Sequence, residues 1–253
     1  EKNYINKNFI IDLKNKSTFN FGNVSFDFVI NIASAVPSKY NDREEIFSIN
    51  VDGLIEMFRK LNLSPSAKII NFSTQSVYNC PTDDVIYENS EKETLKSYGL
   101  SKFKFEMNLI DLYKDSDVSI ANLRIPVLLC PNIKNNFISK WMNNIIKEEP
   151  VNISNLNSNF NAVVNIESLV DFLFKMKIGV KKSINVASSE PITMHEMCSY
   201  IHKKLNKVTK FQEITSSTKC QLIDTKLSEE LGFIPPTTIT IIDNYLRQGH
   251  FYE

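Results

Sequence analysis

Phe72-Ser-Thr-Gln-Ser-Val-Tyr78 and, further along the chain, Tyr98-Gly-Leu-Ser-Lys102 are the stretches of sequence that decide the fold. The first puts several hydroxyl groups at the end of an apolar run. The second puts a phenol and an ammonium group four residues apart, which places them on one face of a helix. From that position the charge of Lys102 is expected to lower the pKa of Tyr98 from about 10 towards neutrality. A tyrosine with such a pKa can exchange a proton with a substrate hydroxyl group.

The surrounding elements are needed to interpret this pair, because a Tyr and a Lys four residues apart also occur on ordinary solvent-facing helices. Phe26 to Ser34 opens with apolar residues and ends in small ones, which predicts a strand buried on both faces. Glu44 to Leu61 has apolar residues at helical spacing. Lys68 to Ser73 predicts a second buried strand, with Thr74 just past its carboxyl end. In open parallel α/β sheets, ligands bind at those strand ends, and right-handed crossovers bring the following loops to the same edge.

A series of motifs runs along nearly the whole chain. They are Phe9-Ile-Ile-Asp12-Leu13 (a strand-end Asp), Asn31-Ile-Ala-Ser34 (compare H-x-A-A), Asn50-Val-Asp-Gly53 (N-V-x-G-T), Phe72 to Tyr78 (S-S/T-x-x-V-Y), Tyr98 to Lys102 (Y-x-x-x-K), Leu123-Arg-Ile-Pro126 (L-R-x-x), Ser183 to Ile192 (Y-N-V-G-S-G-x-P-x) and Asp224 to Pro235 (K-x-x-x-L-G-W-x-P). Together they resemble the extended short-chain dehydrogenase/reductase family, in its NAD-dependent sugar-nucleotide epimerase, dehydratase and reductase branch. The set is much more specific than any one of its members.

The resemblance implies an α/β fold, with a Rossmann-like doubly wound parallel sheet and a small C-terminal substrate lobe. Residues 1–130 are expected to form the NAD(P)-binding domain, without its N-terminal part. Residues 131–253 are expected to form mainly the substrate-binding lobe, with segments that return to the core sheet. In that second part the sequence predicts helices over Phe137 to Ile146, from about Glu167, and over Met194 to Leu205 with Thr193 as its N-cap.

The resemblance also implies a site. The catalytic residues are Thr74, Tyr98 and Lys102: Tyr98, as phenolate, takes the proton from a sugar 4-hydroxyl group, Thr74 holds the same oxygen, and Lys102 bonds the nicotinamide ribose and stabilises the phenolate. The other interpretation of Thr74 is a strand-end hydroxyl that bonds its own backbone. The cofactor is NAD, with NADP as the alternative. The residues expected to bind it are Asp12, whose carboxylate contacts the adenine, Leu13, Ile32, Ala33, Ser34, Asn50, Ser73, Tyr98, Lys102, Ile125 and Pro126.

Departures from the family motifs separate the possible reactions. The family's dehydratases carry Asp-Glu after the catalytic Thr, whereas this chain has Gln75-Ser76, neither of which can protonate a leaving hydroxyl group at neutral pH. Dehydration is therefore excluded. Val127 and Asn161 stand where galactose-type epimerases carry an Asn and an Arg that bind the nucleotide diphosphate. A nucleoside-diphosphate-sugar 4-epimerase is the first hypothesis. A 4-keto-sugar reductase and a non-catalytic NAD(P)-binding member of the same fold are the alternatives.

The chain has no glycine-rich turn of the kind that receives a pyrophosphate, because its six glycines are scattered. We therefore expect a missing N-terminal stretch of roughly 40 to 60 residues before Glu1, since a parallel sheet of this kind otherwise loses its central strand. The alternative is a shortened paralogue that cannot bind NAD.

Composition agrees with a single cytoplasmic enzyme. The 253 residues are 42% hydrophobic and carry no net charge, so neither nucleic acid nor an anionic membrane is expected as a partner, and no apolar run is long enough to span a bilayer. The four cysteines show neither close pairing nor metal-like spacing, which favours free thiols in a reducing compartment, and the three histidines are too dispersed for a metal site. The expected partners are a nucleotide-sugar substrate and a second copy of the chain.

The expected homodimer would use two apolar stripes, one over Glu44 to Leu61 and one over Phe103 to Leu112. In the alternative, both stripes face only the chain's own sheet.

Overall fold

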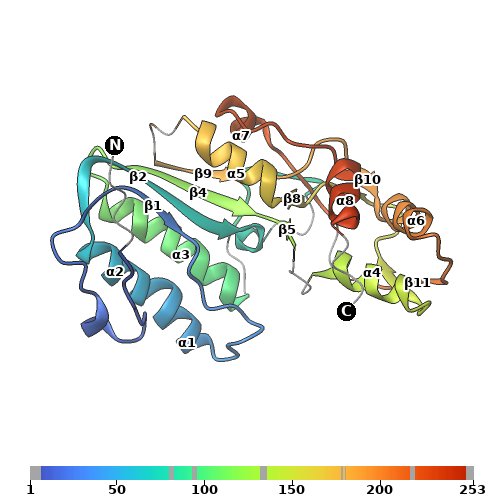
Figure 1. Ribbon diagram of the computed structural model, residues 1–253, viewed down its shortest axis with the longest axis horizontal. Helices are drawn as coiled ribbons and strands as arrows, with labels where there is room; N and C mark the ends of the chain where they lie inside the picture. The colour runs from blue at the N-terminus through green and yellow to red at the C-terminus, as the bar shows by residue number, and fades with distance from the viewer. Residues whose placement is uncertain are drawn as a thin grey trace. The chain divides into compact units, whose positions relative to one another are not determined.

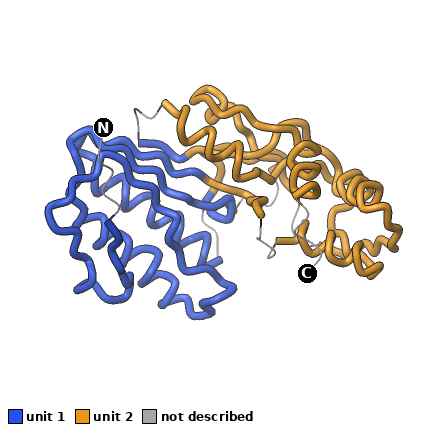
Figure 2. Tube along the Cα trace, in the orientation of Figure 1, with its two compact units in different colours: residues 1–78, 92–123, 178–183 blue, residues 79–91, 124–177, 184–253 orange. Residues whose placement is uncertain are grey.

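The computed structural model describes residues 7–79, 83–92, 96–131, 136–177, 179, 181–216 and 220–248, so Cys80 and His250 lie outside the described residues. Two compact units interleave along the chain (Figure 2). The first comprises residues 1–78, 92–123 and 178–183, and the second comprises residues 79–91, 124–177 and 184–253. Each unit has its own hydrophobic core. Among the described residues, no helix is both long enough and apolar enough to cross a membrane.

A four-stranded sheet runs through the first unit in the order β1 (Ser25–Asn31), β2 (Asn62–Thr74), β4 (Ser119–Ile125) and β9 (Lys181–Asn185) (Figure 1). β1 pairs with β2 in parallel, with Val29 opposite Ile69 and Asn31 opposite Asn71. The predicted Rossmann-like α/β fold, a parallel sheet with flanking helices, is confirmed.

The helical layer of the first unit comes from the two stretches predicted to be helical. α1 (Arg43–Phe47), the π-helical turn η2 (Ser48–Gly53) and α2 (Leu54–Lys60) follow one another without a break, and α3 (Ser97–Leu112) packs beside them (Figure 1). Asp42 is the N-cap of α1, because its carboxylate accepts hydrogen bonds from two backbone amides of the first turn. Two short 3-10 turns, η1 (Lys16–Thr18) and η3 (Gln75–Val77), complete this unit.

The apolar stripes of these helices pack against their own sheet. Leu54, Phe58, Phe105 and Leu109 are fully buried in one cluster with residues of β2 and β4. These positions are therefore not free to form a contact between two copies of the chain. A homodimer stays a prediction.

β1 is more exposed than its apolar sequence predicts. It lies at one edge of the four-stranded sheet, and its Phe28 and Ile30 side chains are 44% and 46% exposed. Val29, on the opposite face, packs beside the buried cluster of the helices. The prediction of burial on both faces is therefore wrong for β1, because within the described chain the helices of this unit cover only one of its faces.

Phe9 to Leu13 do not form the expected strand end. The backbone N–H of Asp12 bonds the Thr18 hydroxyl, and the Asp12 carboxylate accepts a hydrogen bond from the backbone N–H of Lys14. These bonds shape a turn at Asp12, and residues 9–13 are not assigned to a strand.

A row of buried amides crosses the sheet at one level. Asn31 Nδ2 donates to Asn71 Oδ1 over 2.9 Å, and Asn71 Nδ2 donates to Asn122 Oδ1 over 2.8 Å. All three side chains are at most 4% exposed. The row therefore links β1, β2 and β4 through polar groups that cannot exchange their partners for water.

The second unit is built from short elements around its own core. Its strands form two-stranded sheets, of which β5–β8, β6–β11 and β3–β12 are parallel and β7–β10 is antiparallel. The elements are β3 (Val85–Ile86), β5 (Val127–Leu129), α4 (Phe137–Ile146), β6 (Val151–Ser154), β7 (Asn159–Phe160), β8 (Val163–Asn165), α5 (Ile166–Lys175), β10 (Ile192–Thr193), α6 (Met194–Leu205), β11 (Phe211–Ile214), β12 (Leu222–Ile223), α7 (Lys226–Glu230) and α8 (Thr238–Arg247).

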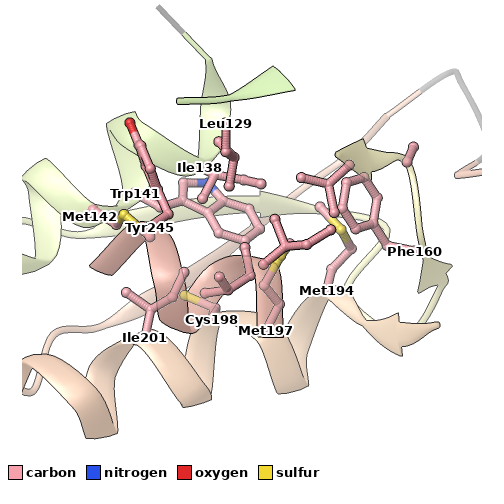
Figure 3. Packing of buried hydrophobic residues seen from close by; sticks show 14 of the residues in the cluster. Leu129, Ile138, Trp141, Met142, Phe160, Met194, Met197, Cys198, Ile201 and Tyr245 are labelled. Atoms are coloured by element: carbon pink, nitrogen blue, oxygen red, sulfur yellow. The ribbon is translucent and has the colours of Figure 1, made fainter. Parts of the chain in front are cut away.

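The core of this unit lies between α4, α6 and α8. Figure 3 shows Trp141 of α4 packed among Met197 and Cys198 of α6, with Tyr245 of α8 beside them. The three helices predicted for this part of the sequence are confirmed at α4, α5 and α6. Thr193 caps α6 as predicted, in a capping box with Glu196.

Replacing the central amide of the row should destabilise the first unit. Asn71→Ala leaves Asn31 Nδ2 and Asn122 Oδ1 buried without their partner, and we expect the free energy of unfolding to fall by about 2 to 4 kcal/mol. Urea denaturation measures the change as a lower midpoint at an unchanged slope. Asn62→Ala, at the exposed start of the same strand, is the control. Equal midpoints for the two variants would show that the row contributes nothing.

Candidate active site

The buried side chain of Asn50 connects the two parts of the predicted site. Its Oδ1 accepts a 2.6 Å bond from the backbone N–H of Ala35 and lies 3.2 Å from the Ser34 hydroxyl. Its Nδ2 donates to the Ala35 carbonyl and to the Ser101 hydroxyl, each over 3.0 Å. Ser101 in turn donates to the Tyr98 carbonyl over 2.8 Å. One amide therefore positions the loop after β1 against the first turn of α3.

Tyr98 lies in that first turn, partly buried. Burial raises the pKa of its phenol, and a hydrogen bond with the Ser34 hydroxyl acts in the opposite direction. The expectation that Lys102 lowers the pKa of Tyr98 towards neutrality is wrong for the chain as described. Desolvation of the phenolate dominates here, because the phenol is largely removed from water.

Lys102, one helical turn after Tyr98, is only 1% exposed. Burial lowers the pKa of its ammonium group from 10.5 to about 8, and the nearby charge of Glu106 partly offsets this effect. Lys102 is therefore mostly protonated at neutral pH but gives up its proton at a lower pH than an ordinary lysine.

Thr74 lies at the carboxyl end of β2, where it is the last residue of the strand rather than the residue just past it, and it begins the turn η3. Its hydroxyl oxygen accepts a 3.2 Å bond from the backbone N–H of Ser76, which is the local bonding considered as the other interpretation of this residue. A hydroxyl that accepts one bond still has a proton to donate. The neighbouring Ser73 donates its hydroxyl proton to the carboxylate of Glu106.

Two pockets open in the first unit, and Tyr40 lines both. One, with a volume of about 400 Å³, is lined by Tyr98 together with Ser76, Lys96 and Asn41. The other, of about 310 Å³, brings together Asp12, Leu13 and Ser34, three of the residues predicted to bind the cofactor.

Gly53 allows the chain to close the second pocket. A Cβ at this position would overlap the carbonyl oxygen of Leu13, so only glycine lets η2 approach the turn that carries Asp12 and Leu13 this closely. The role of Gly53 as a spacer for this turn was missed in the sequence, although the glycine itself is part of the N-V-x-G motif.

The remaining predicted residues are less closely associated with these pockets. Ile32 is 71% exposed and Ala33 is exposed, next to Ser34. Ile125 and Pro126 belong to the second unit, so their contact with a cofactor stays a prediction. Within the described ranges, no group of three or more His, Cys, Asp or Glu side chains could hold a metal ion.

Residues 3–176 match the profile of the NAD dependent epimerase/dehydratase family. The chain belongs to this family. Over 76 residues it is 34% identical to UDP-glucose 4-epimerase of Vibrio cholerae, an alignment that covers 30% of this chain and 23% of that relative.

Solved structures of low sequence identity share the fold of this family member. RMD from Pseudomonas aeruginosa, complexed with NADPH, matches with a TM-score of 0.78 and 14% identity over 94% of this chain and 86% of that chain. ADP-L-glycero-D-manno-heptose-6-epimerase of Helicobacter pylori matches with a TM-score of 0.77 and 17% identity, over 94% and 77%. UDP-glucuronic acid 4-epimerase of Bacillus cereus, in complex with NAD, matches with a TM-score of 0.75 and 17% identity, over 90% and 76%.

The pocket around Asp12 suits the adenosine half of NAD, the cofactor of the family. Adenine carries an amino group that needs an acceptor, and the Asp12 carboxylate supplies one at the pocket wall. Ser34 adds a hydroxyl group to the same wall, which can bond a ribose hydroxyl. The residues that line this pocket therefore fit the adenosine half of the group.

Gly53→Ala should weaken NAD binding without disrupting the helix. The added methyl group pushes the turn of Asp12 and Leu13 away, and overpacking of this kind costs about 1–3 kcal/mol, so we expect NAD to bind about tenfold more weakly or worse. Titration calorimetry measures the affinity, and circular dichroism checks the helix content. Gly179→Ala is the control, because an added Cβ there meets nothing within 4 Å. Unchanged NAD affinity in the Gly53 variant would contradict the role of the close approach.

The buried ammonium group of Lys102 should make stability depend on pH. Its pKa of about 8 lies below the 10.5 of the unfolded chain, so between these values the unfolded chain binds more protons and the folded state gains stability as the pH rises. The unfolding free energy of the wild type should therefore rise by about 3 kcal/mol relative to Lys102→Met between pH 7 and pH 10.5. Chemical denaturation at a series of pH values measures the difference. A difference that does not vary with pH would mean that Lys102 titrates as an ordinary lysine.

Proposed function

We propose that the protein is a nucleoside-diphosphate-sugar 4-epimerase that uses Tyr98 as its acid and base. The observation that supports this most strongly is the position of the Tyr98 phenol. It lines a pocket of about 400 Å³, it is bonded to Ser34, and it is one turn from the buried ammonium group of Lys102. The family is NAD dependent, and the relative in Vibrio cholerae is a UDP-glucose 4-epimerase.

Each residue has a part in moving one proton. Tyr98 takes the proton from the sugar 4-hydroxyl group in one half-reaction and returns a proton to the same oxygen in the other. Lys102, mostly protonated at neutral pH, supplies ammonium donors for the nicotinamide ribose. Thr74 donates its hydroxyl proton to the sugar oxygen and so orients it for Tyr98. NAD, when bound, supplies the hydride acceptor and donor at C4.

The lining of the larger pocket supports epimerisation over dehydration. Ser76 occupies the position where a dehydratase of the family carries an acid, and no Asp or Glu is among the described residues that line this pocket. Elimination of water needs a group that can protonate the leaving hydroxyl, and serine cannot do so at neutral pH.

A 4-keto-sugar reductase is the second candidate, because proton donation by Tyr98 to a 4-keto oxygen needs the same three residues. RMD from Pseudomonas aeruginosa, which shares the fold, was crystallised with NADPH. In that case NADP(H) would replace NAD. The non-catalytic alternative gives no physical reason to keep Thr74, Tyr98 and Lys102 together.

The proposed setting is the cytoplasm. Cys130, Cys198 and Cys220 are free thiols, which supports a reducing compartment. The proposed substrate is a nucleotide sugar, and we propose no nucleic-acid or membrane partner.

Tyr98→Phe should abolish turnover and leave cofactor binding intact. Loss of a general acid–base group lowers kcat by about 100-fold to 10,000-fold. NMR of UDP-sugar mixtures incubated with the full-length protein detects the C4 epimer. Tyr87→Phe, at an exposed tyrosine of the second unit, is the control. Full activity in the Tyr98 variant would contradict the proposal.

The nicotinamide released by denaturing the purified full-length protein separates the candidates. Stoichiometric NAD supports the epimerase, because the cofactor must keep the hydride between the two half-reactions. Protein without bound cofactor that consumes NADPH with a 4-keto sugar supports the reductase.

A further inference from the structure

Glu106 lies on the face of α3 that carries Tyr98 and Lys102, one turn beyond Lys102. It is 1% exposed. Among the described residues of the first unit, Lys102 and Glu106 are the charged side chains that are buried. The two buried charges of this unit therefore belong to one helix and one face, next to the proposed acid–base residue.

Hydrogen bonds from two strands hold the Glu106 carboxylate. Ser73, near the end of β2, donates its hydroxyl proton to one carboxylate oxygen, and Ser183 of β9 donates to the other over 2.8 Å. Ser73 directly precedes Thr74, the proposed ligand of the sugar oxygen. The carboxylate therefore ties the end of β2 to α3 and to β9.

A carboxylate in this position needs compensation, because burying a charge without partners costs several kcal/mol. The two hydroxyl groups supply part of the compensation, and the ammonium group of Lys102 supplies opposite charge. The charge of Glu106 in turn raises the pKa of Lys102, against the effect of burial. Without Glu106, Lys102 would give up its proton closer to neutral pH.

Other charged groups near α3 are exposed or have partners of their own. On β4, Arg124 is buried and donates to the backbone carbonyl of Glu88 over 3.0 Å. On the elements packed against α3, Arg43, Glu44, Asp52, Arg59, Lys60 and Lys68 are exposed, as is Lys104 of α3 itself. The half-buried Glu45 and Glu56 form ion pairs with Lys14 and Arg59. On β9, Lys182 is exposed and Lys181 donates to the carbonyls of Lys114 and Ser116.

We propose that Glu106 is a positioning residue of the acid–base site, which keeps Lys102 charged and holds the strand end that carries Thr74 through Ser73. The proposal rests on the proposed function for its catalytic meaning. Its physical content is the protonation of Lys102 and the geometry of β2, α3 and β9, and these can be measured without turnover.

The test compares Glu106→Gln with the wild type by NMR titration of the lysine side-chain nitrogens in labelled full-length protein. The Lys102 signal is assigned by its absence in Lys102→Met. Glutamine keeps an acceptor for one serine but removes the charge. We expect the midpoint of the Lys102 titration to fall by about one pH unit or more in Glu106→Gln. Asp111→Asn, which removes an exposed carboxylate from the same helix, should leave it unchanged. An unchanged midpoint in folded Glu106→Gln would overturn the proposal.

Glu106→Asp keeps the charge and serves as the second variant if Glu106→Gln does not fold. Its Lys102 midpoint should stay near that of the wild type, and a midpoint lowered by one unit or more in the folded Asp variant would overturn the proposal.

If the protein turns over a nucleotide sugar, the alkaline limb of the kcat profile should move to lower pH in Glu106→Gln, with KM little changed. A shifted Lys102 midpoint in a protein without turnover would count against the proposed function alone. Normal turnover with an unshifted Lys102 midpoint in Glu106→Gln would count against the proposed role of Glu106 alone.

Discussion

The buried amide of Asn50 is the interaction on which the arrangement of the site depends. It bonds both the N–H and the carbonyl of Ala35 and also the hydroxyl of Ser101, so the loop after β1 and the start of α3 cannot move independently. Ser34 and Tyr98 belong to these two segments. Because the amide is completely buried, water cannot replace its partners, and the loop and helix keep their separation. The position of Tyr98 therefore depends on a hydrogen-bond network that its own carbonyl joins through Ser101.

The layer beneath the site is unusually polar for a sheet–helix interface. Asn31, Asn71 and Asn122 link three strands, and Lys102 and Glu106 place opposite charges between α3 and the strand ends. Groups of this kind reduce stability unless every one of them is paired. The buried charges of Lys102 and Glu106 follow Tyr98 along one face of α3, so this face carries a cost in stability. Phe105 and Leu109 of the same helix are buried in the apolar cluster of the first unit.

Much of the fold could be predicted from the sequence, because periodicity and motif order report local structure directly. The helices at Phe137 and Met194 begin at the predicted residues, since their apolar spacing and caps are local. The exposure of β1 could not be predicted, because it depends on which strands pair with it. The raised pKa of Tyr98 was also missed, since depth of burial is a property of packing. Glu106 was readable in principle from its spacing after Lys102, but its burial and its two serine partners come from β2 and β9.

Isotope tracing can show whether the hydrogen at C4 of the sugar moves as a hydride, as proposed for this protein. The full-length protein would be incubated with a UDP-hexose that carries deuterium at C4, in ordinary water, and the epimers would be analysed by NMR. Hydride transfer predicts that the deuterium remains at C4 in both epimers, because the label moves as hydride to the bound nicotinamide and back. Loss of the deuterium to solvent during epimerisation would contradict it, since that result requires C4 to release a proton rather than a hydride.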